Sequence, residues 1–134
     1  MGEENRKDSH IGETIVFTTN GYNGEVVGEW SLTINNVYTT DKRNQFEDPI
    51  NQVVVIEYTV ENINIPDDDF CLDLECAGEF YNSDGCEVWV YPGGDGIYNL
   101  AKGMKANGTA CIGINNDTPY LEMYFGGMTY KWTF

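Results

Sequence analysis

The sequence is poor in histidine, in basic residues and in long hydrophobic segments. It has one histidine, His10, and 7 Lys and Arg residues against 22 Asp and Glu, for a formal net charge of −15. No uninterrupted apolar run exceeds four residues, as at Val53–Ile56, so no segment is long enough to span a bilayer. Because phosphates and anionic lipids are bound by clustered positive charge, the composition excludes nucleic acid and charge-driven membrane docking. One histidine and three serines, without a GxSxG motif, leave no basis for a histidine-dependent hydrolytic triad.

The chain is nevertheless rich enough in apolar residues to fold. Its 134 residues suit one domain, and 41% hydrophobic and 13% aromatic residues supply a core. Residues 1–10, MGEENRKDSH, are polar and resemble neither a signal peptide nor a myristoylation site. We expect residues 1–10 to be a disordered leader or a remnant of a longer chain, and residues 11–134 to form a single domain.

The four cysteines show no CxxC spacing, which argues against a zinc ribbon or a thioredoxin motif. Two disulfides would suit a small domain of an oxidising compartment, and four reduced thiols are the alternative. Strand alternation places Cys76 and Cys86 toward the core and Cys71 and Cys111 outward. We therefore expect the pairs Cys76–Cys86 and Cys71–Cys111.

Alternation of apolar and polar residues dominates the chain, and it predicts strands. Only the stretch around Asn99–Lys105 has the pattern of a short helical turn. A break in the alternation at Asn35–Asn36 predicts a β-bulge, and Gly126–Gly127 predicts a tight hairpin. The expected strands cover about residues 13–19, 29–38, 51–62, 70–80, 86–91, 108–114, 121–125 and 129–134. Seven to eight short antiparallel strands with turn signals between them predict an all-β sandwich.

Aromatic residues on the polar faces of strands are the first candidates for a binding site. If Val88 and Val90 face the core, their neighbours Trp89 and Tyr91 face solvent, and Tyr120 and Tyr124 similarly oppose an inward set. Exposed aromatic clusters often bind sugars or proteins. The alternative is that these rings fill the core or lie under loops.

An acidic run, Asp67, Asp68 and Asp69, is a candidate Ca²⁺ site, with Asp73 or Glu75 nearby. Calcium prefers six to eight oxygen ligands. The spacing is not that of an EF-hand, and adjacent aspartates point in different directions. Solvated surface acids are the alternative, and the sequence calls for no other cofactor.

Several segments in order resemble a known family, namely IGETIVF, WSLTINNVY, VVVIEYTVEN, NSDG and LAKGMKANGTACIGI. Together they resemble the immunoglobulin-like domain of Gram-positive (Firmicutes) surface lipoproteins, which is similar in fold to the immunoprotective secreted antigen of mycobacteria. The resemblance covers residues 11–134. It implies an immunoglobulin-like sandwich outside the membrane, tethered by lipid on an N-terminal cysteine absent from this sequence, and it implies no catalytic residues.

The sequence thus favours a non-enzymatic, extracellular binding or adhesion module that recognises a protein or a glycan. A carbohydrate-binding module, or a small glycosidase using paired acids, is the alternative. A concave aromatic groove with two facing carboxylates would favour that alternative, and a featureless surface would favour a structural spacer.

Overall fold

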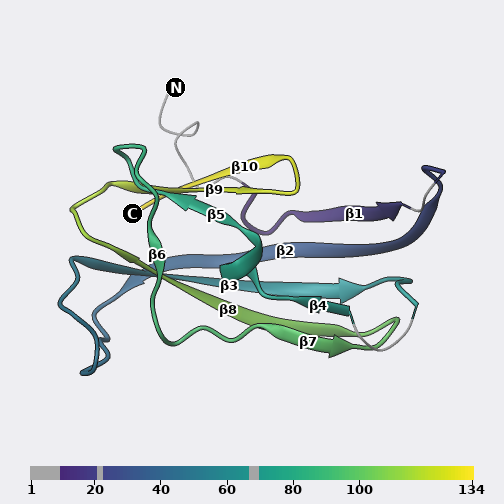
Figure 1. Cartoon of the computed structure of the whole chain (residues 1–134), viewed down its shortest axis with the longest axis horizontal. Coiled ribbons are helices and arrows are strands. Elements are labelled where there is room, and N and C mark those ends of the chain that lie inside the picture. The colour runs from purple at the N-terminus through teal and green to yellow at the C-terminus, as the bar shows by residue number, and fades with distance from the viewer. Residues whose placement is uncertain (1–9, 21–22, 67–69) are drawn as a thin grey trace.

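The structure is a computed structural model, and it describes residues 10–20, 23–66 and 70–134 (Figure 1). Within these ranges every regular element is a strand except one short helix, α2 (Leu74–Ala77). The strands are β1 (Thr14–Asn20), β2 (Val26–Thr40), β3 (Gln52–Asn62), β4 (Phe70–Leu72), β5 (Glu79–Tyr81), β6 (Trp89–Val90), β7 (Ile97–Leu100), β8 (Lys105–Ile114), β9 (Tyr120–Phe125) and β10 (Met128–Thr133). No helix of the described part is long and apolar enough to cross a membrane.

The larger sheet contains five antiparallel strands in the order β1-β2-β3-β8-β6. Its centre is β3, which pairs with β2 on one side and β8 on the other along its whole length. Successive strand residues face opposite sides of a sheet, so one set of β3 side chains enters the core. That set is fully buried and comprises Val54, Ile56, Tyr58 and Val60.

A β-bulge interrupts β2 where the sequence predicts it. The pairing register with β3 shifts between Ile34 and Asn36. Leu32 and Ile34 face the core before the bulge, and Val37 packs against the core after it. The shift therefore keeps apolar side chains on the inner face along a 15-residue strand.

The opposite layer consists of a three-stranded sheet, β10-β9-β5, and a two-stranded pair, β4-β7. Leu121 and Met123 of β9 and Tyr130 and Trp132 of β10 are buried against the larger sheet. The turn between β9 and β10 is Gly126–Gly127, with φ angles of 60° and 78° that favour glycine. The predicted hairpin is confirmed.

The two layers enclose one main hydrophobic core. Trp30 of β2 stacks on Phe17 of β1 with ring centroids 4.7 Å apart, and Phe125 of β9 meets Phe17 edge-on at 5.4 Å. These contacts join both layers, and the predicted all-β sandwich is confirmed.

The expected strand 70–80 is wrong. The chain leaves β4 after Leu72, and Asp73 caps the helical turn α2 by accepting a hydrogen bond from the Glu75 backbone N–H at 3.1 Å. An aspartate before a short run of good helix formers is a preferred N-cap. The strand resumes as β5 at Glu79.

Two other local expectations also differ from the structure. The stretch 99–105 is not a helical turn, because β7 continues to Leu100 and a turn with Gly103 at φ 84° leads into β8. The expected strand 86–91 is shortened to the two residues of β6. With these changes, ten strands lie in the described ranges instead of seven to eight.

The end of the expected leader packs on the sandwich. The His10 ring meets the Tyr130 ring edge-on at 5.1 Å, and its Nδ1 lies 2.7 Å from Glu13 Oε1. The other nine residues of the leader lie outside the described ranges.

Candidate functional site

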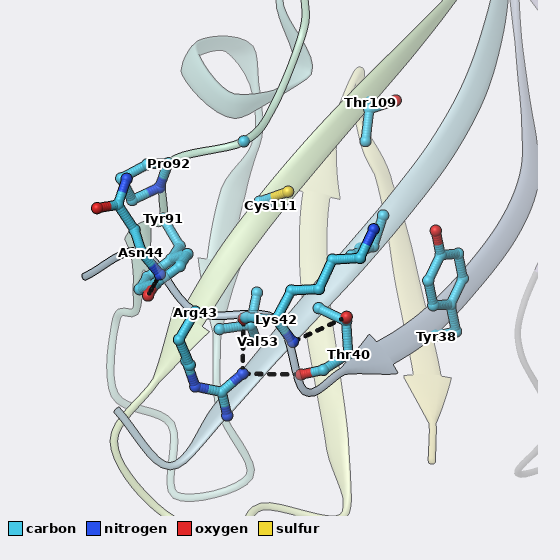
Figure 2. A pocket seen from close by; sticks show the side chains of 12 residues that line it. Tyr38, Thr40, Lys42, Arg43, Asn44, Val53, Tyr91, Pro92, Thr109 and Cys111 are labelled. Carbon is cyan, nitrogen blue, oxygen red and sulfur yellow. Dashed lines mark hydrogen bonds between the residues drawn. The ribbon is translucent and has the colours of Figure 1, made fainter. Parts of the chain in front are cut away.

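A groove of about 430 Å³ lies on the outer face of the larger sheet, the face turned away from the main core (Figure 2). We call it the outer-face groove. Its floor is Val53 and Val55 of β3 and Cys111 of β8. The loop after β2 forms one wall and the chain after β6 forms the other. Mostly apolar hollows of this size with a few polar groups are typical of ligand sites.

The floor is apolar because two strands place hydrophobic residues on both faces. Val53, Val55 and Cys111 alternate with core residues and pack with Ile50 and Tyr91 into a second, smaller cluster. A sheet face that only met water would carry polar residues here. Here Ile50 of the loop after β2 and Tyr91 of the chain after β6 cover these side chains, which are at most 7% exposed.

Tyr91 closes one end of the outer-face groove. Its backbone N–H donates to the Cys111 carbonyl at 2.8 Å, and its hydroxyl accepts from the Asn44 backbone N–H at 2.8 Å. The ring therefore lies beneath the loop after β2 and is only 6% exposed. The Tyr91 side chain leaves the sheet on its outer face, as alternation predicts. The expectation that it is solvent-facing is nevertheless wrong, because the loop after β2 covers it.

Glu75 of α2 supports the wall formed by the chain after β6. This chain separates from β8 at Pro92 and rejoins it at Asp95. Between these points the Glu75 carboxylate takes the place of a strand, accepting from the Cys111 backbone N–H at 2.8 Å. Gly94 passes directly over this carboxylate, where a Cβ would collide with it. Burial raises the pKa of Glu75, and the hydrogen bond from Cys111 opposes that rise.

Two adjacent cations lie in the wall formed by the loop after β2, and they differ in what they contact. The Arg43 guanidinium donates to the carbonyls of Thr40 at 2.8 Å, Lys42 at 2.9 Å and Asn51 at 3.3 Å, so it fixes the loop. The Lys42 side chain instead extends across the groove toward Tyr38 (Figure 2). Its ammonium makes no ion pair with the described residues. Lys42 is therefore available to a ligand.

The Cys111 thiol on the floor is not activated. Burial and the negative charge of Glu75 both raise its pKa. A cysteine nucleophile requires a lowered pKa, so the groove favours binding over covalent chemistry.

The outer-face groove continues into a polar hollow of about 260 Å³. Thr109 lines both, and Tyr38 bridges them by donating its hydroxyl to Glu57 Oε2 at 3.0 Å. This hydrogen bond is the main cause of the raised pKa of Tyr38. Beyond Glu57, Asn35 and Asn107 complete the hollow.

The structure separates the four aromatic residues predicted to bind. Trp89 is 67% exposed on β6, as expected, whereas its inward-predicted neighbour Val90 is 51% exposed at the sheet edge. Tyr120 and Tyr124 belong to β9, in the other layer. The four rings therefore form no single surface, and their binding roles stay predictions.

Tyr120 and Tyr124 have their own neighbours. The Lys131 Nζ lies 4.0 Å from the centroid of the Tyr120 ring. Tyr124 lies beside Tyr81, with ring centroids 5.4 Å apart, and is 40% exposed.

Neither expected disulfide is present, and no disulfide joins any of the four cysteines, all of which lie in the described ranges. Cys76 was assigned to a core-facing strand position, but it lies on α2 and is exposed because strand alternation does not hold there. Cys86 precedes the shortened β6 and is also exposed. Cys71 is exposed as expected. Cys111 leaves the sheet outward as expected, but it is buried in the groove floor.

The acidic run Asp67, Asp68 and Asp69 lies outside the described residues, so a Ca²⁺ site there stays a prediction. The two neighbouring acids are both used in hydrogen bonds. Asp73 caps α2 and accepts from the Tyr98 hydroxyl at 2.8 Å, and this contact raises the pKa of Tyr98 to about 12. No cluster of three metal-ligating residues occurs in the ranges that the structure describes.

The groove residues escaped the sequence interpretation because they come from separated segments. Lys42 and Arg43 lie in a segment that appears only as a polar loop, yet an adjacent pair of cations among only 7 in the chain is a signal that could have been used. Tyr38 and Glu57 meet only through the pairing of β2 with β3.

Comparison with known proteins identifies a fold and no family. No protein-family model matches the chain, and no curated protein matches it. Among solved structures, it is similar to a secreted protein from Mycobacterium tuberculosis, MPT63, with a TM-score of 0.55 and 14% sequence identity. The match covers 89% of this chain and 92% of that chain. The expected similarity in fold to the mycobacterial secreted antigen is confirmed.

Proposed function

We propose that the protein is a non-enzymatic binding module that holds its ligand in the outer-face groove. The observation that carries this proposal is the combination of an apolar floor with the Lys42 ammonium, which has no ion-pair partner in the described chain. The floor side chains Val53, Val55 and Cys111 are themselves at most 7% exposed, so the hollow offers a cation together with limited apolar contact, which favours a ligand with a small apolar part and a negative or strongly polar group.

The polar groups around the groove support binding over catalysis. The Cys111 thiol has a raised pKa, and the Glu57 carboxylate accepts from Tyr38. A glycosidase would place a second carboxylate about 5–10 Å from the first, across the substrate. In the described chain, Glu57 is the one carboxylate lining the groove and its polar extension.

We further propose that this module acts outside the cell. The similar protein MPT63 is described as secreted, and the family resemblance points to a surface lipoprotein. The genomic sequence upstream of this chain tests the anchored form of the proposal. A lipobox cysteine there would support it, and an uninterrupted cytosolic protein would contradict it.

The binding proposal can be tested with 1-anilinonaphthalene-8-sulfonate, an aromatic anion whose fluorescence rises in apolar sites. We expect the folded protein to bind it, and Lys42→Glu to weaken binding by about tenfold because an attractive charge becomes repulsive. Thr109→Trp, which fills the groove where it meets the polar hollow, should also weaken binding.

The matched control is Lys102→Glu. Lys102 is exposed in the turn after β7, at the opposite end of the sandwich from the loop after β2 (Figure 1). The control makes the same change in net charge, so it should bind the probe as the unmodified protein does. If all three variants bind it equally well, the outer-face groove is not the ligand site.

A further inference from the structure

We propose that the ligand of the outer-face groove is a short oligosaccharide with one acidic sugar, whose carboxylate lies at Lys42 and whose neutral sugars extend over the polar hollow. This inference rests on the proposed binding function and adds the ligand class. The evidence for this ligand class is the order of apolar and polar side chains along the outer face of the larger sheet.

Strand pairing arranges the outer face in rows across β2, β3 and β8. One row contains Tyr38, Val55 and Cys111. The next contains Asn36, Glu57 and Thr109, and the one after it contains Thr33, Thr59 and Asn107. Successive rows lie two residues apart along β3 and β8, which is about 7 Å, and the β-bulge adds one residue to the second step along β2. The rows thus form a track that changes from apolar to polar and is longer than one sugar ring.

The polar end of the track has the pattern of donors and acceptors that hydroxyl groups require. Asn35 donates its side-chain N–H to Thr59 Oγ1 at 2.8 Å, and Thr59 donates to Asn107 Oδ1 at 2.7 Å. This chain of bonds fixes both amides and leaves the Asn35 carbonyl oxygen and the Asn107 amino group without a hydrogen-bond partner among the described residues. A sugar hydroxyl both donates and accepts, so it can satisfy the two groups together.

Tyr38 lies between the apolar and polar parts. Its hydroxyl is held by Glu57, and its ring is 38% exposed at the rim of the groove. A ring that is fixed and half-open offers a flat face to the C–H side of a sugar. The Glu57 oxygens can accept from hydroxyls at the same position.

Charge selects a ligand with a single negative group. Lys42 attracts an anion at one end of the track, whereas Glu57 and the net charge of −15 repel further anions. Exposed charges are screened beyond about 8 Å at physiological salt, so the nearby Lys42 outweighs the distant acids. A polyanion would bring negative groups beside Glu57.

An extended peptide fits this surface less well. Peptides that bind sheets commonly pair with a free strand edge. The central strand below the track, β3, already has partners on both sides, whereas β2 pairs with β1 only as far as Thr33. The backbone groups of β3 are therefore unavailable, so side chains contact a ligand that lies over the middle of the track.

The proposal can be tested by NMR titration of the ¹⁵N-labelled full chain with three probes. These are 3′-sialyllactose, which carries one terminal carboxylate, the neutral disaccharide lactose, and tetragalacturonate, a polyanion. We expect 3′-sialyllactose to shift the amide signals of the rows described above. It should bind about tenfold more tightly than lactose, as expected for one charge-assisted contact, and more tightly than tetragalacturonate.

Variants then locate the two ends of the ligand. Lys42→Gln should abolish the preference for 3′-sialyllactose over lactose, and Asn107→Ala should weaken both, while the control Lys102→Gln should change neither. A dispersed amide spectrum shows that each variant is folded, and the comparison of probes on the unmodified protein does not depend on any variant.

The outcomes separate this inference from the proposed function. If the groove binds 1-anilinonaphthalene-8-sulfonate but none of the saccharides shifts its signals, the glycan inference is wrong and the binding function stands. Equal affinity for 3′-sialyllactose and lactose, or tighter binding of tetragalacturonate, would also overturn it. If neither the fluorophore nor any saccharide reaches the groove, both proposals are wrong.

Discussion

Removing the Glu75 side chain should loosen the wall of the outer-face groove and destabilise the fold. Glu75 is the acceptor for the Cys111 backbone N–H in the gap that the chain leaves between Tyr91 and Asp95. Leaving a partly buried N–H unpaired costs about 1–3 kcal/mol. The carboxylate's own desolvation, which raises its pKa, offsets part of this cost.

We therefore expect Glu75→Ala to lower the free energy of unfolding by about 1–2 kcal/mol, or Tm by about 4–8 °C for a domain of this size. Glu75→Gln keeps an acceptor oxygen and should stay within about 0.5 kcal/mol of the unmodified protein, the range of an ordinary tolerated change. Urea denaturation measures both, and hydrogen exchange of the Cys111 amide reports the local bond. If Glu75→Ala unfolds at the same urea concentration and leaves the Cys111 amide equally protected, the role assigned to Glu75 is refuted.

Three further predictions concern the pH dependence of Glu75, a buried hydroxyl and a turn. Because the folded-state pKa of Glu75 is raised above its ordinary 4.5, the folded protein binds this proton more readily than the unfolded chain. The contribution of Glu75 to the free energy of unfolding should be fully present below pH 4.5 and lost as pH rises through the folded-state pKa. Urea titrations over this pH range measure it as the free energy of unfolding of the unmodified protein minus that of Glu75→Gln. A difference that does not change with pH would contradict the prediction. The Tyr130 hydroxyl is buried without a hydrogen-bond partner among the described residues, so Tyr130→Phe should leave stability unchanged or raise it by up to about 1 kcal/mol; a loss above 1 kcal/mol by the same method would show a missed partner. Gly126 has φ 60° and faces Phe17, which a Cβ would strike, so Gly126→Ala should cost at least about 1 kcal/mol, and thermal unfolding at an unchanged Tm would show that the turn relaxes freely.

The sandwich was predictable because its signal is local. In β3 the alternation of Ile56, Tyr58 and Val60 with polar neighbours determines which face is buried, and no distant residue is needed to see it. The bulge near Asn35 follows from the same pattern. Alternation failed at 70–80, where the cap at Asp73 favours a helical turn over continued strand.

The binding site could not be predicted in the same way, because it depends on contacts between segments far apart in the sequence. Tyr91 has the alternation of an exposed residue, and only the hydrogen bond from Asn44 shows that a loop covers it. The groove floor is apolar on the face that alternation assigns to solvent. The sequence also does not show that Lys42 lies over an uncharged surface, which is what makes it a candidate ligand-binding residue.

The most direct test of the binding site is a set of intermolecular NOEs between 1-anilinonaphthalene-8-sulfonate and the folded protein. Occupancy of the outer-face groove predicts NOEs from the probe's ring protons to the Val55 methyl groups and the Tyr38 ring. NOEs to Trp89 or Tyr124 alone would place the ligand on the aromatic residues that the sequence suggested and would contradict the assignment made from the structure.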